Sequence, residues 1–336
     1  MNNFSKLQKL PKLKPDLLVV GQATIDDINR EGEGLVAERI PGGDSIYAAL
    51  GASIWPLKIG VVTIVGQDYP YEKMDLATCR PEDTDWTGLV AYPGPSMHAR
   101  AFYSKDGGRI FKWDDFSLTT KLSPGVDDIP ALWQEVSFIH LAPSDPIRQL
   151  ELTRYFSAKG AIVSLDTEKH FFQAGRDALI GCLKFDPIFI PSLEHVQLLS
   201  GIQSEDIDDL WPWISTCGVS LAVIKCGAQG AWVIDVKQKK KWHMGVVENL
   251  HLVDVTGAGD SFCGGFMAGY MYTHDPLQAA AYGAVSASFI VESLGARKPS
   301  HYQKELAELR LAGMLKKIPT PKIFSILEKN NKSKSF

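Results

Sequence analysis

The sequence predicts an α/β protein built on a doubly wound, mostly parallel β-sheet with helices on both faces. Three observations support this fold class. Short β-branched apolar runs alternate with longer amphipathic runs along most of the 336 residues. The apolar runs are continuous, as expected for strands buried on both faces. Serine or acidic residues stand near the starts of the amphipathic runs, where they indicate helix N-termini.

The expected elements follow one another in regular order. Strands are expected at residues 16–21, 60–66, 137–143, 161–167, 186–192, 220–227 and 250–255. Helices are expected at residues 45–53, 145–160, 192–201 and 204–216, and after residue 260. Residues 230–247 indicate a further hairpin that turns near its lysine run, 237–241, which we interpret as a solvated turn. Sheets of this class bind ligands beyond the carboxyl ends of their strands.

Two regions break the alternation. Residues 28–41 are polar and rich in glycine, without helical periodicity. Residues 97–113 indicate two strands around a Lys105-Asp106-Gly107-Gly108 turn. Together they predict a small β-sheet lid over the active cleft, at about residues 28–43 and 97–117. The alternative is that both segments are plain surface excursions.

The composition excludes several classes of protein. A net charge of -4 and a pI near 6.1 do not indicate a protein that binds nucleic acid. No apolar run reaches the roughly 18 residues of a membrane span, and residues 1–15 do not indicate a signal peptide. The five cysteines form no CxxC pair, which argues against structural zinc and for a reducing, cytoplasmic location. We expect one domain at residues 16–330, with tails at 1–15 and 331–336.

The most informative stretch is DVTGAGDSFCGGF, residues 254–266. After Asp260, the aromatic residues Phe262, Phe266 and Tyr270 recur every four residues and therefore share one face of a helix. Residues 257–259 therefore lie at a helix N-terminus, where free N–H groups attract an anion. No Walker motif and no dinucleotide-binding fingerprint occur in the chain. Asp260 is either a helix cap or a general base beside a transferring phosphoryl group.

This stretch resembles the C-terminal signature of the ribokinase/PfkB family of carbohydrate kinases, and the resemblance spans about residues 16–299. It implies a ribokinase-like fold and ATP-dependent phosphorylation of a hydroxyl on a small sugar or sugar-like alcohol, with Mg²⁺. It also implies that the amides of Gly257, Ala258 and Gly259 form an anion hole and that Asp260 deprotonates the acceptor.

The resemblance also implies binding roles for further residues. Asp26, Gly42 and Gly43 are expected to hold the acceptor. The nucleotide is expected to contact the four residues Lys225, Gly227, Gly230 and Thr256, although a hairpin turn is the alternative for the two glycines at 227 and 230.

Three acidic or glycine positions near strand ends have two interpretations each. Asp166 either approaches the substrates or caps a helix. Gly66 and Asp68 match a family segment, but a turn with its cap is the favoured interpretation.

Two departures from the family pattern concern the acceptor and the metal. Tyr47 stands where the family carries an asparagine that reaches a substrate hydroxyl. Its phenol either donates a hydrogen bond or packs under the helix. Glu194 is shifted by one residue from the family's metal-linked acid, and His195 takes the expected place. We expect Glu194 to hold Mg²⁺ through water and His195 to be a polar surface residue.

Other functions remain open at this point. A nucleoside, cyclitol or vitamin-like alcohol kinase on the same fold is the first alternative, because Tyr47 changes the acceptor site. A non-catalytic, ligand-binding pseudokinase is the second, although the anion loop and Asp260 are retained. The resemblance also makes a homodimer through the lid plausible.

Overall fold

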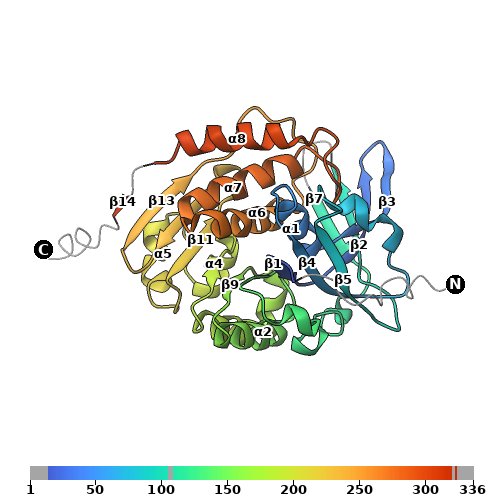
Figure 1. The fold of residues 1–336 in the computed structure, drawn as a ribbon, viewed down its shortest axis with the longest axis horizontal. Helices are drawn as coiled ribbons and strands as arrows, with labels where there is room; N and C mark the ends of the chain where they lie inside the picture. Colours follow the sequence, from blue (N-terminus) through green and yellow to red (C-terminus); the bar gives the residue numbers. More distant parts are fainter. Residues whose placement is uncertain (1–13, 105–108, 320–321, 324–336) are drawn as a thin grey trace, which may run out of the picture.

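The computed structural model describes residues 14–104, 109–319 and 322–323 and contains two sheets (Figure 1). The large sheet has ten strands in the order β14-β13-β12-β11-β10-β9-β8-β1-β4-β5. The strands from β11 to β5 run parallel, and β12, β13 and β14 are antiparallel. The strand bounds are β1 (Leu17–Val20), β4 (Ile59–Val65), β5 (Thr84–Ala91), β8 (Phe138–Leu141), β9 (Ile162–Leu165), β10 (Ile188–Phe189), β11 (Leu221–Lys225), β12 (Ala231–Asp235), β13 (Lys240–Met244) and β14 (Lys322–Ile323).

Helices cover both faces of this sheet, so the predicted doubly wound α/β class is confirmed (Figure 1). In β1, Leu17 and Val19 point into one hydrophobic core, while Leu18 and Val20 point into the other. This double burial explains the continuous apolar runs of the sequence. One core is closed by α1 (Asp44–Ala52), α6 (Ala258–Thr273), α7 (Pro276–Ile290) and α8 (Lys304–Lys316). The other is closed by α2 (Pro146–Ala158), α3 (Phe172–Leu183), α4 (Leu193–Ser200) and α5 (Ile207–Ile214).

Helices α1 and α6 approach each other very closely. A Cβ atom at Gly264 of α6 would lie 1.8 Å from the carbonyl oxygen of Ala48 on α1. The Ser261 hydroxyl of α6 donates to the carbonyl oxygen of Tyr47, at 2.9 Å. This contact fixes the N-terminal turn of α6 against α1.

The small sheet is the lid, with strand order β3-β2-β6-β7. Strands β2 and β6 are parallel, and the two outer pairs are antiparallel. Strand β2 begins at Thr24, so Asp26 lies on the lid itself. The predicted hairpin is present as β6 and β7, and its turn residues 105–108 lie outside the described residues. The bounds are β2 (Thr24–Arg30), β3 (Gly34–Gly42), β6 (His98–Tyr103) and β7 (Arg109–Trp113).

One strand prediction was wrong. Residues 250–255 form no strand, and the N–H groups of Val253 and Asp254 both bond to the carbonyl oxygen of Val291, at 2.7 and 3.2 Å. The side chains of Leu252 and Val255 are 64% and 52% exposed, so the apolar run does not mark a buried strand. The predicted tails lie almost wholly outside the described residues. Among the helices of the described ranges, none has the length and apolar character that crossing a membrane requires.

Candidate active site

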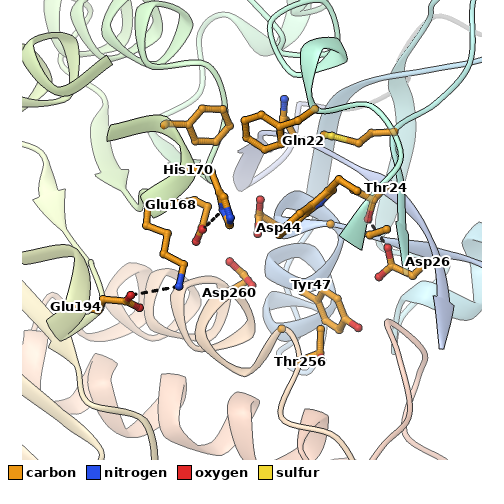
Figure 2. A pocket seen from close by; sticks show the side chains of 18 residues that line it. Gln22, Thr24, Asp26, Asp44, Tyr47, Glu168, His170, Glu194, Thr256 and Asp260 are labelled. Carbon is orange, nitrogen blue, oxygen red and sulfur yellow. Dashed lines mark hydrogen bonds and ion pairs between the residues drawn. The ribbon is translucent and has the colours of Figure 1, made fainter. Parts of the chain in front are cut away.

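A cavity of about 330 Å³ lies between the lid and the carboxyl ends of the central strands (Figure 2). This volume is at the lower end of the range for small-molecule sites. The lid and the large sheet both contribute to its wall. The lining residues are Gln22, Thr24, Asp26, Gly43, Asp44, Tyr47, Met97, Ala99, Trp113, Phe116, Glu168, Lys169, His170, Phe171, Glu194, Thr256, Gly257 and Asp260.

Asp260 reaches this cavity from the first turn of α6. The N-cap position is taken by Gly257, so Asp260 stands inside the helix. Burial raises the pKa of the Asp260 carboxyl to about 7, the Lys225 ammonium lowers it, and the charges of Asp166 and Glu168 raise it. A carboxyl with this pKa is poised to exchange a proton near neutral pH.

The loop before α6 meets the cavity at Thr256 and Gly257. Gly257 has a φ of 71°, in the left-handed region that favours glycine, and a Cβ there would lie 2.0 Å from Tyr47 Cδ1. The atom nearest to a Cβ placed at Gly259 would be Lys225 Nζ, 3.6 Å away. The Ala258 amide donates to the carbonyl oxygen of Val255, at 3.3 Å. Amides at a helix N-terminus and a nearby cation are features of an anion site. Ala258 is the first residue of α6, between these glycines.

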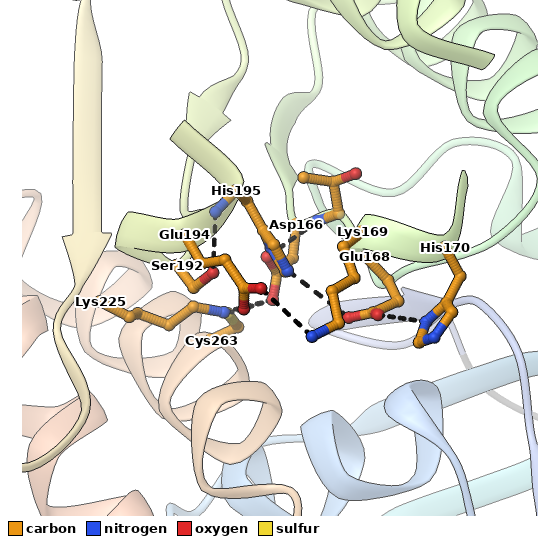
Figure 3. A network of polar contacts seen from close by, with 10 residues as sticks. Asp166, Glu168, Lys169, His170, Ser192, Glu194, His195, Lys225 and Cys263 are labelled. Atoms are coloured by element: carbon orange, nitrogen blue, oxygen red, sulfur yellow. Dashed lines mark hydrogen bonds and ion pairs between the residues drawn. The ribbon is translucent and has the colours of Figure 1, made fainter. Parts of the chain in front are cut away.

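Lys225 lies at the end of β11 and is held by two polar groups (Figure 3). Its ammonium forms an ion pair with the Asp166 carboxylate and contacts Cys263 Sγ at 3.2 Å. Although burial opposes the charge, the adjacent Asp166 carboxylate raises the pKa of Lys225, which therefore stays protonated. Asp166 does not line the cavity; besides this ion pair it accepts a hydrogen bond of 2.8 Å from the Thr167 amide.

Asp26 enters the cavity from lid strand β2. Its carboxylate accepts a hydrogen bond of 2.5 Å from the Thr24 hydroxyl. Burial raises the pKa of Asp26 to about 7, the Thr24 hydrogen bond lowers it, and the Asp254 charge raises it. A Cβ at Gly42 would lie 2.0 Å from Asp26 Oδ2, so only glycine leaves room for this carboxylate. Gly43 follows with a φ of 91° and lines the cavity.

Tyr47 stands between the acceptor side of the cavity and the loop before α6. Its ring packs against Gly257, and the side chain is 2% exposed. The hydroxyl has no hydrogen-bond partner among the described residues. Figure 2 shows this hydroxyl directed away from Asp260. The structure therefore favours the packing interpretation of Tyr47.

Five side chains beyond β9 and β10 form a polar network at the cavity wall (Figure 3). Although burial raises the pKa of Glu168, contacts with His195 and His170 lower it to about 2, so this carboxylate is ionised. Glu194 lines the cavity and pairs with the Lys169 ammonium at 3.2 Å. The surface prediction for His195 was wrong: the residue is 8% exposed, and its Nε2 lies 3.5 Å from Glu168 Oε2.

Eight predicted positions do not line this cavity: Gly42, Gly66, Asp68, Lys225, Gly227, Gly230, Ala258 and Gly259. Gly227 and Gly230 form the tight connection between β11 and β12, with φ values of 56° and 89°. The turn interpretation of Gly66 and Asp68 fits the geometry. Asp68 accepts a hydrogen bond of 2.7 Å from the Ser96 amide and contacts His98 Nε2 of the lid at 2.9 Å.

The sequence interpretation missed Asp44 and an aromatic group at the cavity. Asp44 opens α1 and lines the cavity, and burial followed by the Asp260 charge raises its pKa well above the usual value. Its position directly after two glycines and at a helix start was the available signal. Trp113 contacts His170 at 4.7 Å between ring centroids, and Phe116 contacts Phe171 at 5.9 Å. These rings come from distant segments, so no local pattern indicated the group.

Comparisons with known proteins test the predicted resemblance. A model of the pfkB family carbohydrate kinases matches residues 158–302, which include Lys225 and the whole of α6. The chain is 28% identical over 257 residues to the cytidine kinase of Thermococcus kodakarensis, covering 76% of this chain and 88% of that relative. The predicted resemblance to the PfkB family is confirmed, and the chain is an ATP-dependent kinase.

Solved structures agree on the fold. The ribokinase of Arabidopsis thaliana, complexed with ribose and ATP, superposes with a TM-score of 0.70 at 18% identity and covers 89% of this chain and 99% of its own. A putative ribokinase II from E. coli, in complex with ATP and Mg²⁺, has a TM-score of 0.70 at 17% identity and covers 90% of this chain and 100% of its own. The ribokinase-like fold with a β-sheet lid is therefore confirmed.

Proposed function

We propose that this PfkB-family kinase transfers the γ-phosphoryl group of ATP to a hydroxyl of a small sugar or sugar-like alcohol. One observation supports this proposal above the others. The half-buried Asp260 carboxyl, with a pKa of about 7, shares one cavity with the left-handed Gly257 of the anion loop and with Asp26 of the lid. A base, an anion site and an acceptor site are the three parts that alcohol phosphorylation needs.

In the proposed reaction the acceptor oxygen attacks the γ-phosphorus as its proton passes to the Asp260 carboxylate. The new P–O bond forms while the bond from the γ-phosphorus to the bridging oxygen of ADP breaks. Backbone N–H groups of residues 257–259 stabilise the charge on the transferring phosphoryl group. The lid over the cavity excludes water, which limits hydrolysis of ATP.

The residues around the anion loop fit the phosphates of ATP. The Tyr47 ring fills the space beside Gly257, whereas a Cβ at Gly259 would face the protonated Lys225 ammonium at 3.6 Å. We propose that Lys225, Thr256, Gly227 and Gly230 contact the nucleotide.

Mg²⁺ is proposed to bind through water. Among the described residues no group of three or more acidic, histidine or cysteine side chains is arranged to hold a metal ion directly. The cavity-lining carboxylate of Glu194 suits a water-mediated role. Bound there, Mg²⁺ would neutralise charge on the ATP phosphates.

Asp26, Gly42, Gly43 and Tyr47 are proposed to shape the acceptor site. Replacement of Asp26 by alanine is expected to raise the KM for the acceptor by about 10- to 100-fold, because a buried hydrogen bond to a substrate hydroxyl is lost. The KM for ATP is expected to stay within about twofold, because Asp26 lies on the lid. Steady-state kinetics with each substrate varied will measure both constants.

Asp27→Ala is the matched control for that prediction. Asp27 is the next residue of β2, does not line the cavity, and accepts a hydrogen bond of 2.7 Å from the Arg39 amide. An acceptor KM that changes equally in both variants would show that Asp26 acts only through lid stability.

The pH dependence of the reaction follows from the pKa of Asp260. Only the ionised carboxylate accepts a proton, so kcat/KM for the acceptor is expected to be low in acid and to rise through a pH of about 7. A pH–rate profile checks this. The acidic limb is expected to persist in Asp26→Asn, since Asp26 has the same pKa of about 7 but takes no proton in the reaction. A flat profile across this range would contradict the assignment.

A nucleoside is the second candidate acceptor, and the aromatic side of the cavity favours it. Trp113, Phe116 and Phe171 line the cavity beside His170. Such rings suit the flat face of a base, and stacking on an aromatic side chain contributes about 1–3 kcal/mol per base. The similarity to a cytidine kinase supports the same class.

Acceptor-dependent release of ADP tests the proposed function. Purified protein with Mg²⁺ and ATP is incubated with ribose, other monosaccharides, cyclitols, cytidine and other nucleosides. ADP released with sugars alone identifies a sugar kinase, and release with nucleosides alone identifies a nucleoside kinase. If ATP binds but no panel member increases ADP release, the non-catalytic alternative is favoured over the proposed function.

Two smaller proposals accompany this one. The five cysteines are all free thiols, which supports a cytoplasmic location. Dimerisation through the lid stays a prediction; the exposed Phe102 and Ile110 side chains on β6 and β7 support it.

A further inference from the structure

Two neighbouring lid strands end against the segment that leads into the anion loop. Arg30 closes β2 and Tyr103 closes β6, and these residues are partners in the parallel register. The Arg30 guanidinium donates to the carbonyl oxygen of Val253, at 3.2 Å. The Tyr103 hydroxyl donates to Asp254 Oδ1 at 2.5 Å and bonds to the Thr256 hydroxyl. The lid therefore contacts residues 253–256 at two points.

Asp254 organises this segment. Its side chain is buried, and Oδ1 accepts a 2.7 Å hydrogen bond from the Thr256 amide as well as the Tyr103 bond. Oδ2 accepts a 3.3 Å hydrogen bond from the Gly295 amide. The lid hydroxyl is thus one of three donors that hold a buried carboxylate in place. A hydrogen bond to a charged acceptor is stronger than one between neutral groups.

The segment that Asp254 holds continues directly into the anion loop. Thr256 lines the cavity, and the next residue is the left-handed Gly257. A change in the backbone at Thr256 reorients the amides that follow, because Thr256 and Gly257 are adjacent in the chain. The position of the Tyr103 hydroxyl therefore bears on the direction of the proposed phosphate-binding amides.

The same two lid strands build the acceptor side of the cavity. Thr24 and Asp26 come from β2, and Ala99 comes from β6, the strand that ends at Tyr103. A movement of the lid that opens the acceptor site also withdraws the Tyr103 hydroxyl from Asp254. The acceptor-side residues and Tyr103 therefore belong to one sheet.

We propose that Tyr103 is a positioning residue that couples acceptor binding under the lid to assembly of the phosphate-binding loop. The proposal rests on the proposed function, because it assumes that the acceptor binds beside Asp26. Without an acceptor the loop is incompletely assembled, and ATP is protected from hydrolysis. With the acceptor bound, the lid closes and the Tyr103 hydroxyl fixes Asp254 and Thr256.

Tyr103→Phe tests the coupling, because it removes the hydroxyl and keeps the ring. With cytidine and ribose as the acceptors, kcat is expected to fall roughly 10- to 100-fold, the value of a hydrogen bond to a charged group. Without acceptor, ATP affinity is expected to stay within about twofold. In the unmodified protein, acceptor binding is expected to increase the affinity for MgADP with tetrafluoroaluminate. In Tyr103→Phe this increase is expected to be smaller by roughly 10- to 100-fold.

Tyr272→Phe is the matched control. Its hydroxyl donates to the carbonyl oxygen of Pro56 at 2.9 Å, and the residue is exposed near the far end of α6. This variant also loses a tyrosine hydroxyl bond but is expected to keep kcat and the coupling.

A second variant keeps the proposal open to contradiction. Arg30→Met removes the other lid contact and is expected to reduce the same coupling by a smaller factor. Normal kcat and normal coupling in Tyr103→Phe would overturn the proposal. A lowered melting temperature with unchanged coupling would also overturn it, because Tyr103 would then be structural only. Absence of acceptor-dependent turnover in the unmodified protein would instead contradict the proposed function.

Discussion

Replacement of Asp260 by asparagine is expected to lower kcat by about 10²–10⁴, the usual contribution of a general base. Asparagine has nearly the same shape but accepts no proton from the acceptor hydroxyl. ATP binding is expected to persist, because the glycine amides and Lys225 are unchanged. Steady-state kinetics together with calorimetric titration of ATP will measure both quantities. Turnover near that of the unmodified protein would remove the proposed role of Asp260.

The stability of this variant provides its control. Because the folded-state pKa of Asp260 is raised from 3.8 to about 7, the folded protein binds more protons than the unfolded chain between these values. The contribution of Asp260 to stability therefore falls as the pH rises from about 4 to about 7. At pH 8 the ionised, half-buried carboxylate is unfavourable, and Asp260→Asn is expected to melt at a higher temperature. Loss of activity with a raised melting temperature separates catalysis from folding.

Gly257→Ala is expected to lower kcat by about 10²–10³, the usual effect of losing one donor of an anion hole. The new Cβ would lie 2.0 Å from Tyr47 Cδ1, so the ring or the loop has to move. The φ of 71° adds a conformational cost of about 1–2 kcal/mol for any residue with a Cβ. Kinetics and thermal melting will measure both effects.

Gly160→Ala isolates the conformational cost. Gly160 has a φ of 76°, and a Cβ there meets no atom within 4 Å. This variant is expected to lose a similar conformational energy with unchanged kcat. The double variant Gly257→Ala with Tyr47→Ala removes the clash together with a buried ring, so its loss of stability is expected to be smaller than the sum of the losses in the two single variants. Full activity in Gly257→Ala would contradict the anion-hole assignment.

The fold class and the anion loop could be predicted because their signals are local. Continuous apolar strands indicate double burial wherever their partners lie, and the TGAGD stretch carries its glycines, acid and helix start within five residues. The prediction of a strand at residues 250–255 was wrong because strand pairing is not a local property. Apolar residues there indicated a strand, but pairing depends on a neighbour, and the carbonyl oxygen of Val291 is the partner instead.

The remaining parts of the candidate site depend on contacts between distant segments. Tyr103 and Asp254 are separated by 151 residues, and only the assembled lid brings them together. His195 was expected at the surface as a polar residue of a helix. It is buried because the Phe172 ring of α3 lies 5.6 Å away and Glu168 approaches its other side. Tyr47 could be identified as a departure, but its contact with Gly257 required the packing of α1 against α6.

A crystal structure with ADP, Mg²⁺, tetrafluoroaluminate and an accepted alcohol would test the central claim most directly. The account predicts that the planar fluoride anion lies on the N–H groups of residues 257–259. It also predicts the acceptor hydroxyl at about 2.6–3.2 Å from the Asp260 carboxylate. An anion bound away from this loop, or a carboxylate out of reach of the acceptor hydroxyl, would contradict it.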